Sequence, residues 1–290
     1  MDSELAVVVV TYSPGETLDD LLDSLAKATS REDVRVILAD NGSTDGVPQR
    51  AAAERDNVEF LPTGGNLGYG RAANKAVRSL PPEVGWILVT NPDIALHPGA
   101  LDELLATAER WPRGGAFGPL IREPSGAVYP SARLLPSLGR GIGHALAGRI
   151  WRGNPWTKTY RQEDASITER PAGWLSGSCF LVRREAFESV GGFDPRYFMY
   201  FEDVDLGDRL GQAGWLNVYV PTAEVTHAGG HATSRVPARM LAEHHRSAYR
   251  YLADRHPGPL YAPLRLALRA GLAARARFEV RRARRPRSAS

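Results

Sequence analysis

The stretch AVVVVTYSPGE, residues 6–16, decides the fold of this chain. Its first part, Ala6 to Thr11, is an apolar and mostly β-branched run, which is typical of a buried strand. Ser13 and Glu16 then have the spacing of a capping box, and Pro14 suits the first position of a helix. The stretch therefore predicts a strand that is followed directly by a helix.

Strands and helices continue to alternate after this stretch. The next segment is predicted to be an amphipathic helix, because its leucines recur at helical spacing: Leu18, Leu21, Leu22 and Leu25. Apolar or periodic runs predict strands at 34–39, 58–61, 86–90, 173–182 and 215–220, and helices at 71–79, 183–190 and 237–251. Such alternation is typical of an α/β fold, in which the ligand crevice lies beyond the carboxyl ends of parallel strands.

Composition limits the class of protein further. A chain of 290 residues can bury a full core, and its longest apolar runs are far shorter than the roughly 20 residues of a bilayer-spanning helix. Cys179 is the only cysteine, which excludes an intrachain disulfide and a thiolate metal site. With no secretion signal at the N-terminus, we expect a cytoplasmic protein.

The C-terminal segment is strongly basic. Nine arginines against one glutamate give residues 265–287 a net charge of +8, which leaves −5 for residues 1–264 of a chain whose total is +3. We predict a catalytic domain at 1–255 and a basic helical extension at 256–290 that contacts an anionic membrane surface rather than nucleic acid. A helical wheel shows no clean amphipathic face in it, so a solvated tail stays open as the alternative.

Polar residues follow three of the predicted strands. They are Thr11-Tyr12, the segment 40–45 (DNGSTD) and Asn91-Pro92-Asp93. Because the carboxyl ends of parallel strands meet at one edge of the sheet, these side chains are expected to surround a nucleotide. A plain turn at 40–45, and a cap of the helix near Pro98 by Asn91-Pro92-Asp93, are the structural alternatives.

A glycine-rich loop, GGNLGYG at 64–70, leads into the predicted helix at 71–79. Such a loop can bring its backbone close to a phosphate. Gly68, Gly70 and Ala73 also match a dinucleotide fingerprint, which suggests a dehydrogenase as an alternative. That alternative is disfavoured because the loop does not follow the first strand of the fold.

The order of these motifs resembles the inverting glycosyltransferases of the GT-A fold, family 2. The resemblance covers most of residues 5–255 and rests on five segments: 7–12, 40–45, 65–70, 91–93 and 201–206. It implies a Rossmann-like three-layer sandwich with a mixed sheet, here with a C-terminal helical extension.

Within the family, the chain is most similar to the actinobacterial cell-wall rhamnosyltransferases. Four segments carry this narrower likeness: 118–122, 129–133, 154–157 and 173–179. It implies transfer of L-rhamnose from dTDP-L-rhamnose to N-acetylglucosaminyl-diphospho-polyprenol in assembly of the arabinogalactan linker. Another sugar nucleotide with a polysaccharide acceptor stays open, as does the oligomeric state. A sugar nucleotidyltransferase is less favoured, since the first strand lacks a glycine-rich, basic loop for a triphosphate.

The resemblance also assigns donor-side residues. A departing diphosphate needs a cation, Mg²⁺ or Mn²⁺, held by hard oxygen ligands. Asp93 matches the metal-binding carboxylate, while Asn91 departs from the common Asp-x-Asp pattern and is expected to face the ribose instead. Asp40 matches the carboxylate that contacts the base, and the other donor-side residues are Thr11, Tyr12, Asn66, Gly68 and Arg71.

The second half is expected to supply the acceptor site and the catalytic base. Inversion requires a carboxylate that removes the proton of the attacking hydroxyl. The resemblance assigns this role to Asp203, with Glu202 orienting the acceptor, and brings His227 to the metal or the diphosphate. Acceptor contacts are expected from Trp174, Ser176 and Gly177.

Several neighbouring residues receive plainer interpretations. Asp205 and Arg209 are expected to form an ion pair across one turn of helix. His231 is a weaker candidate than His227, and the adjacent pair His244 and His245 is expected at the surface or on the acceptor side.

Overall fold

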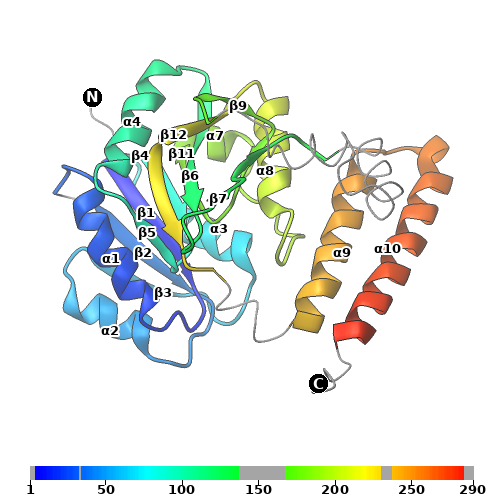
Figure 1. Cartoon of the computed structure of the whole chain (residues 1–290), viewed down its shortest axis with the longest axis horizontal. Helices are drawn as coiled ribbons and strands as arrows, with labels where there is room; N and C mark the ends of the chain where they lie inside the picture. The colour runs from blue at the N-terminus through cyan, green and yellow to red at the C-terminus, as the bar shows by residue number, and fades with distance from the viewer. Residues whose placement is uncertain (1–3, 33, 137–166, 230–236, 284–290) are drawn as a thin grey trace.

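The computed structural model describes residues 4–32, 34–136, 167–229 and 237–283. Among these residues, ten strands form one mixed sheet with helices on both faces, and a helical hairpin stands beside this sandwich (Figure 1). The α/β fold class and the three-layer, mixed-sheet architecture expected from the sequence are confirmed. Segment 154–157 and His231 lie outside the described residues.

The first half of the chain builds the parallel part of the sheet. Strand β1 (Glu4–Thr11) lies between β2 (Arg35–Asp40) and β4 (Val84–Thr90), and β3 (Val58–Pro62) pairs with β2. Residues of β1 point alternately to the two faces and are buried on both, which explains the unbroken apolar run.

The second half extends the sheet with strands of both directions. Strand β11 (Cys179–Arg183) runs antiparallel to β4 and β6 (Gly114–Arg122), and β12 (Leu216–His227) runs parallel to β6. The edge strand β5 (Ile94–Leu96) is antiparallel to β12. Short strands complete the architecture: β7 (Val128–Tyr129), β8 (Ala132–Arg133), β9 (Arg170–Ala172) and β10 (Trp174–Leu175).

In the described ranges, six helices cover the sheet, three on each face. One core lies between the sheet and α1 (Thr17–Ala28), α2 (Val47–Glu54) and α4 (Ala100–Arg110). The other lies between the sheet and α3 (Tyr69–Ser79), α7 (Arg184–Ser189) and α8 (Glu202–Gln212). Helices α3 and α8 therefore approach the strand ends from the same face.

Two local expectations were wrong. Helix α1 begins at Thr17, and Ser13, with φ of +48°, does not cap it; the Ser13 Oγ accepts the Thr44 N–H at 3.0 Å instead. The strand predicted at 215–220 does not end there but continues to His227 as β12, whose register shifts between Val220 and Glu224. In both places a contact between distant segments replaces the locally favoured structure.

The hairpin consists of α9 (Pro237–Asp254), a turn η1 (Pro259–Tyr261) and α10 (Ala262–Ala283). Tyr251 of α9 is buried against Phe201, and its hydroxyl donates to Asp208 of α8 at 3.1 Å. His245 is buried and lies 3.5 Å from Glu279 of α10, so the surface position expected for it was wrong. No helix in the described part of the chain is long and apolar enough to cross a membrane.

Candidate functional site

The ends of β1 and β2 are joined through the buried carboxylate of Asp40. Its Oδ1 accepts a hydrogen bond from the Thr11 hydroxyl at 2.8 Å, and its Oδ2 accepts the N–H groups of Gly42 and Ser43 at 3.1 and 3.0 Å. These contacts fold the 40–45 segment around the carboxylate. Thr11 and Asp40 are therefore together, whereas Tyr12 is 48% exposed beside them.

Asn41, which the sequence interpretation did not single out, connects this corner to the glycine-rich loop. Its Nδ2 donates to the Gly68 carbonyl at 3.3 Å, and its Oδ1 accepts the Leu67 N–H at 3.2 Å. The signal available in the sequence was its place beside Asp40 at a strand end. A single buried amide thus fixes the distance between two loops of the site.

The backbone conformation and close packing at position 68 require a glycine. Its φ is +86°, and a Cβ atom there would lie 2.2 Å from the Phe198 carbonyl oxygen. Asn66 accepts the Gly68 N–H at 3.1 Å, so this side chain shapes the loop, and Arg71 is exposed on the first turn of α3. The close approach brings the 193–201 segment against the glycine-rich loop.

Asp93 and His227 lie side by side at the edge of the sheet. The His227 Nε2 is 3.1 Å from the Asp93 Oδ1, and their side chains are 24% and 11% exposed. The pairing of β5 with β12 places them together, since His227 lies opposite Ile94. The alternative that Asn91-Pro92-Asp93 caps a helix is wrong, because β5 follows it and α4 begins at Ala100.

Asn91 lies next to this pair on the chain and is tied to β11. Its backbone N–H donates to the Ser178 carbonyl at 2.8 Å. The Asn91 side chain makes no hydrogen bond with the residues that the structure describes, so its amide is available to a ligand.

Glu202 and Asp203 open helix α8. Left-handed backbone at Tyr200 and Phe201, with φ of +65° and +66°, turns the chain into the helix. The Asp203 Oδ2 accepts the Gly177 N–H at 2.9 Å, and its Oδ1 accepts the Val204 N–H at 2.8 Å. Asp203 is therefore held against the loop that precedes β11.

The environments of the two carboxyl groups differ. Burial raises the pKa of Glu202 to about 8, and the neighbouring Asp203 charge acts in the same direction. The Glu202 Oε2 has no hydrogen-bond partner in the described residues. Burial also raises the pKa of Asp203, but the N–H groups of Gly177 and Val204 oppose this by favouring its ionised form.

Tyr69, another residue that the sequence interpretation missed, is bound to the loop that holds Asp203. Its hydroxyl donates to the Gly177 carbonyl. Burial raises the pKa of Tyr69 well above its ordinary value, and the charges of Glu202, Asp203 and Asp93 raise it further. The 177–178 loop therefore contacts the start of α3, the Asp203 carboxylate and, through the Asn91 N–H, the segment that leads to Asp93.

The expected acceptor residues line the approach to Asp203. Trp174 packs against α8 at Gly207, and the Cζ of Arg133 lies 5.5 Å from the centre of its ring. Ser176 is buried and exchanges a 2.7 Å hydrogen bond with Ser178. The structure therefore brings Trp174, Ser176 and Gly177 together with the base candidate, and Arg133 occupies one face of the tryptophan.

The sequence of this chain is similar to those of known proteins. The sequence profile described as Glycosyl transferase family 2 matches residues 6–191. The N-acetylglucosaminyl-diphospho-decaprenol L-rhamnosyltransferase of Mycobacterium tuberculosis is 58% identical, over 97% of this chain and 94% of that protein. Rhamnosyltransferase WbbL of Escherichia coli is 27% identical, over 85% of this chain and 92% of that protein.

Solved structures agree with the fold. The mannosyltransferase PcManGT from Pyrobaculum calidifontis, solved in complex with GDP-Man and Mn²⁺, has a TM-score of 0.57 and 19% identity. The likeness covers 97% of this chain and 72% of that one. At this level of identity it concerns the arrangement of helices and strands alone.

Proposed function

The chain belongs to glycosyl transferase family 2, and from this membership we propose that it transfers L-rhamnose from dTDP-L-rhamnose to the N-acetylglucosamine of a polyprenyl-diphosphate-linked acceptor. The observation that carries the proposal is the 58% identity to the M. tuberculosis rhamnosyltransferase along nearly the full length of both chains. The dehydrogenase and nucleotidyltransferase alternatives are set aside by the family. The pathway that we propose is assembly of the arabinogalactan linker of the cell wall.

On the donor side, the nucleotide would lie over the corner formed by Thr11, Asp40 and the glycine-rich loop. The Asp40 carboxylate already accepts four hydrogen bonds, from the hydroxyls of Thr11 and Ser43 and from the N–H groups of Gly42 and Ser43. An N–H of a pyrimidine base would therefore bind Asp40 in place of one of the hydroxyls. The side-chain amide of Asn91 would reach the ribose, and Tyr12, Asn66 and Arg71 would border the donor. These contacts would suit any pyrimidine nucleotide, and a deoxythymidine diphosphate donor is one of them.

The Asp93 and His227 pair fits a divalent cation, Mg²⁺ or Mn²⁺. A carboxylate oxygen and an imidazole nitrogen lie 3.1 Å apart, both partly buried and both able to bind a metal. Among the described residues, no three acidic, histidine or cysteine side chains are placed so that they could hold a metal ion together, so the diphosphate and water would complete the coordination. The cation would neutralise charge on the departing diphosphate.

Asp203 would act as the base for the acceptor hydroxyl, and Glu202 would orient the acceptor. Since the pKa of Glu202 is raised to about 8, this group keeps its proton near neutral pH and can donate a hydrogen bond to a sugar oxygen. The two N–H groups that hold Asp203 favour its ionised form, so Asp203 is the carboxyl group that is available as a carboxylate to accept a proton. Two neighbouring carboxyl groups thereby take different roles, and Trp174, Ser176 and Gly177 would contact the acceptor.

The extension at 256–290 would hold the enzyme at the cytoplasmic face of an anionic membrane, next to its catalytic domain at 1–255. On α10, Leu264, Leu268 and Leu272 recur every four residues and are partly buried, while Leu266 and Phe278 are 69% and 63% exposed. These exposed apolar side chains, with arginines around them, suit a bilayer surface that carries the lipid-linked acceptor.

The test is release of nucleotide by the purified full-length chain from a panel of sugar nucleotides. We expect release from dTDP-L-rhamnose that requires both the polyprenyl-linked acceptor and a divalent cation, and that EDTA abolishes. Faster transfer from another sugar nucleotide would contradict the proposed donor. Equal release with and without the lipid-linked acceptor would contradict the proposed acceptor.

A further inference from the structure

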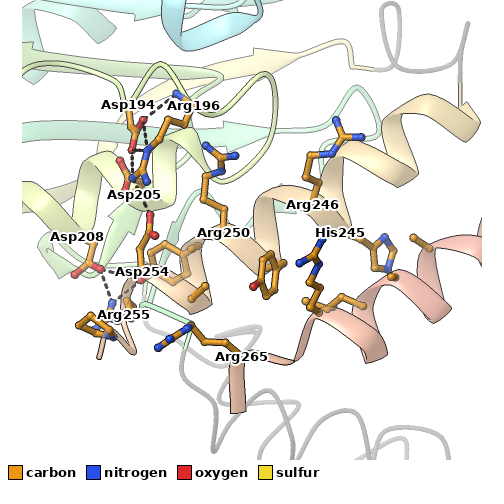
Figure 2. A pocket seen from close by; sticks show the side chains of 18 of the residues that line it. Asp194, Arg196, Asp205, Asp208, His245, Arg246, Arg250, Asp254, Arg255 and Arg265 are labelled. Carbon is orange, nitrogen blue, oxygen red and sulfur yellow. Dashed lines mark hydrogen bonds and ion pairs between the residues drawn. The ribbon is translucent and has the colours of Figure 1, made fainter. Parts of the chain in front are cut away.

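A cleft of about 1300 Å³ lies between α8 with the preceding loop on one side and the α9–α10 hairpin on the other. Its lining contains eight arginines and four aspartates. Figure 2 shows Asp194, Asp205 and Asp208 on the side of α8, with Arg250 on α9 and Arg265 on α10 across from them. The donor and acceptor residues proposed above do not line this cleft.

Each of the four aspartates is paired with one of three arginines. Arg196 pairs with both Asp194 and Asp254, the latter at 2.7 Å. The two remaining pairs are Arg209 with Asp205, and Arg255 with Asp208, at 2.6 Å each. Arg246 pairs with Glu243 on its own helix, so four arginines of the lining have no acidic partner among the described residues: Arg250, Arg265, Arg269 and Arg277.

Arg269 and Arg277 have no hydrogen-bond or ionic partner among the residues that the structure describes. Within the part of the chain that the structure describes, Arg250 contacts only the ring of Tyr197, with its Cζ 5.9 Å from the ring centre. Arg265 donates to two backbone carbonyls, those of His256 and Gly258, and so keeps its positive charge without an acidic partner. Four guanidinium groups in one cleft repel one another unless an anion lies between them.

The remaining lining limits the kind of anion. Leu272, Ala273 and Ala276 give α10 an apolar strip between its arginines. Tyr249 and Ala242 add further apolar surface from α9. A ligand with a charged head and an apolar portion matches this lining better than a bare inorganic ion does.

We propose that this cleft is a binding site for a phosphate-bearing amphiphile, whose phosphate oxygens accept hydrogen bonds from Arg250, Arg269 and Arg277. Guanidinium groups bind phosphate oxygens in a bidentate manner, which gives both charge and geometry. The apolar part of the ligand lies along Leu272 and Ala276. Two sources carry this chemistry, namely the diphosphate of a polyprenyl-linked sugar and the headgroup of an anionic phospholipid.

The experiment compares the full chain with the triple variant Arg250→Gln/Arg269→Gln/Arg277→Gln. Calorimetric titrations in EDTA use two probes, sodium pyrophosphate for the diphosphate and monomeric dioctanoyl phosphatidylglycerol for the headgroup. We expect at least a tenfold increase in Kd for one of them, and the probe affected identifies the source. The control is Arg275→Gln, which removes one arginine charge from α10 but lies outside the cleft, paired with Glu279.

Equal affinities of the triple variant and Arg275→Gln for both probes would overturn the proposal. An equal loss of affinity in the two variants would also overturn it, because the loss would then reflect the overall charge of the protein. Unchanged thermal unfolding and unchanged dTDP-L-rhamnose binding in the presence of Mn²⁺ show that the triple variant is folded. The titrations contain neither substrate, so their outcome is separate from that of the proposed transfer reaction.

Discussion

The backbone N–H of Gly177 donates a hydrogen bond to the Asp203 carboxylate over an N···Oδ2 distance of 2.9 Å. The carbonyl of the same residue accepts the Tyr69 hydroxyl. Gly177 also packs closely, since a Cβ atom there would lie 3.2 Å from that of Asp203. One glycine therefore connects the loop before β11, the start of α3 and the start of α8, and it sets the position of the proposed base.

Asp203→Asn tests the base directly. The amide oxygen can still accept the Gly177 N–H, so the loop is expected to stay in place while the proton acceptor is lost. We expect kcat to fall about 10²–10⁴-fold, the usual contribution of general base catalysis, with donor affinity kept. Steady-state kinetics and donor titration measure the two effects. The exposed Asp20→Asn is the control, and turnover within twofold of the unsubstituted chain would remove Asp203 from the mechanism.

Tyr69→Phe tests whether the hydroxyl positions the base through Gly177. Loss of one hydrogen bond to a buried carbonyl is expected to cost about 1–2 kcal/mol in the free energy of unfolding. Because Gly177 also holds Asp203, kcat should fall while the KM for the donor stays unchanged. Urea unfolding and kinetics on the same preparation measure both. A stability loss with normal kcat would mean that the hydroxyl only supports the fold.

A comparison of Gly68→Ala with Gly64→Ala separates the cost of a steric clash from the cost of backbone strain. Both Gly68 and Gly64 have positive φ, +86° and +90°, but only at Gly68 would a Cβ meet another atom, 2.2 Å from the Phe198 oxygen. Ala at either position strains the backbone by about 1–2 kcal/mol. The clash should add about 1–3 kcal/mol at Gly68 alone. Urea unfolding of the two variants gives the difference, and equal values would show that Phe198 moves away freely.

The sequence was a good guide to the sheet and to the ends of its strands. The β-branched run 6–11 and the apolar run 34–39 could only be strands of a sheet covered on both faces, and their carboxyl ends do hold the polar groups together. The pairing of Asp205 with Arg209 was also predicted correctly, because it is local to one helix. Local periodicity and position at a strand end were sufficient for these features.

Contacts between distant segments were beyond such reasoning. Asn41 and Tyr69 organise the site through bonds to Gly68 and Gly177, and a single sequence contains no signal for those pairings. The Ser13 hydroxyl binds a loop about thirty residues away rather than its own helix. The helical wheel of α10 gave no indication that α9 packs beside it, because that contact joins two separate helices.

Asp93→Asn and His227→Gln test the metal pair. If a cation joins these side chains to the diphosphate, each change should weaken donor binding in Mn²⁺ by about tenfold or more, and the loss should vanish in EDTA. If no cation binds there, Asp93→Asn should instead strengthen donor binding, because it removes a negative charge beside the diphosphate. Donor titrations with Mn²⁺ and with EDTA distinguish the two cases. His97→Gln, at the other end of β5, serves as the control.

Glu202→Gln should change how stability depends on pH. In the folded chain burial raises the pKa of Glu202 to about 8, while the unfolded group releases its proton near its ordinary value of 4.5. Between these values the folded state binds more protons, so this group's contribution is complete below pH 4.5 and is lost as the pH rises towards 8. The slope cannot exceed about 1.4 kcal/mol per pH unit for one group. Urea unfolding in EDTA from pH 5 to 9 should therefore show Glu202→Gln gaining stability relative to the unsubstituted chain as the pH rises. Parallel curves for the two proteins would mean that Glu202 is ionised at neutral pH, and its proposed role as a hydrogen-bond donor to the acceptor would then be lost.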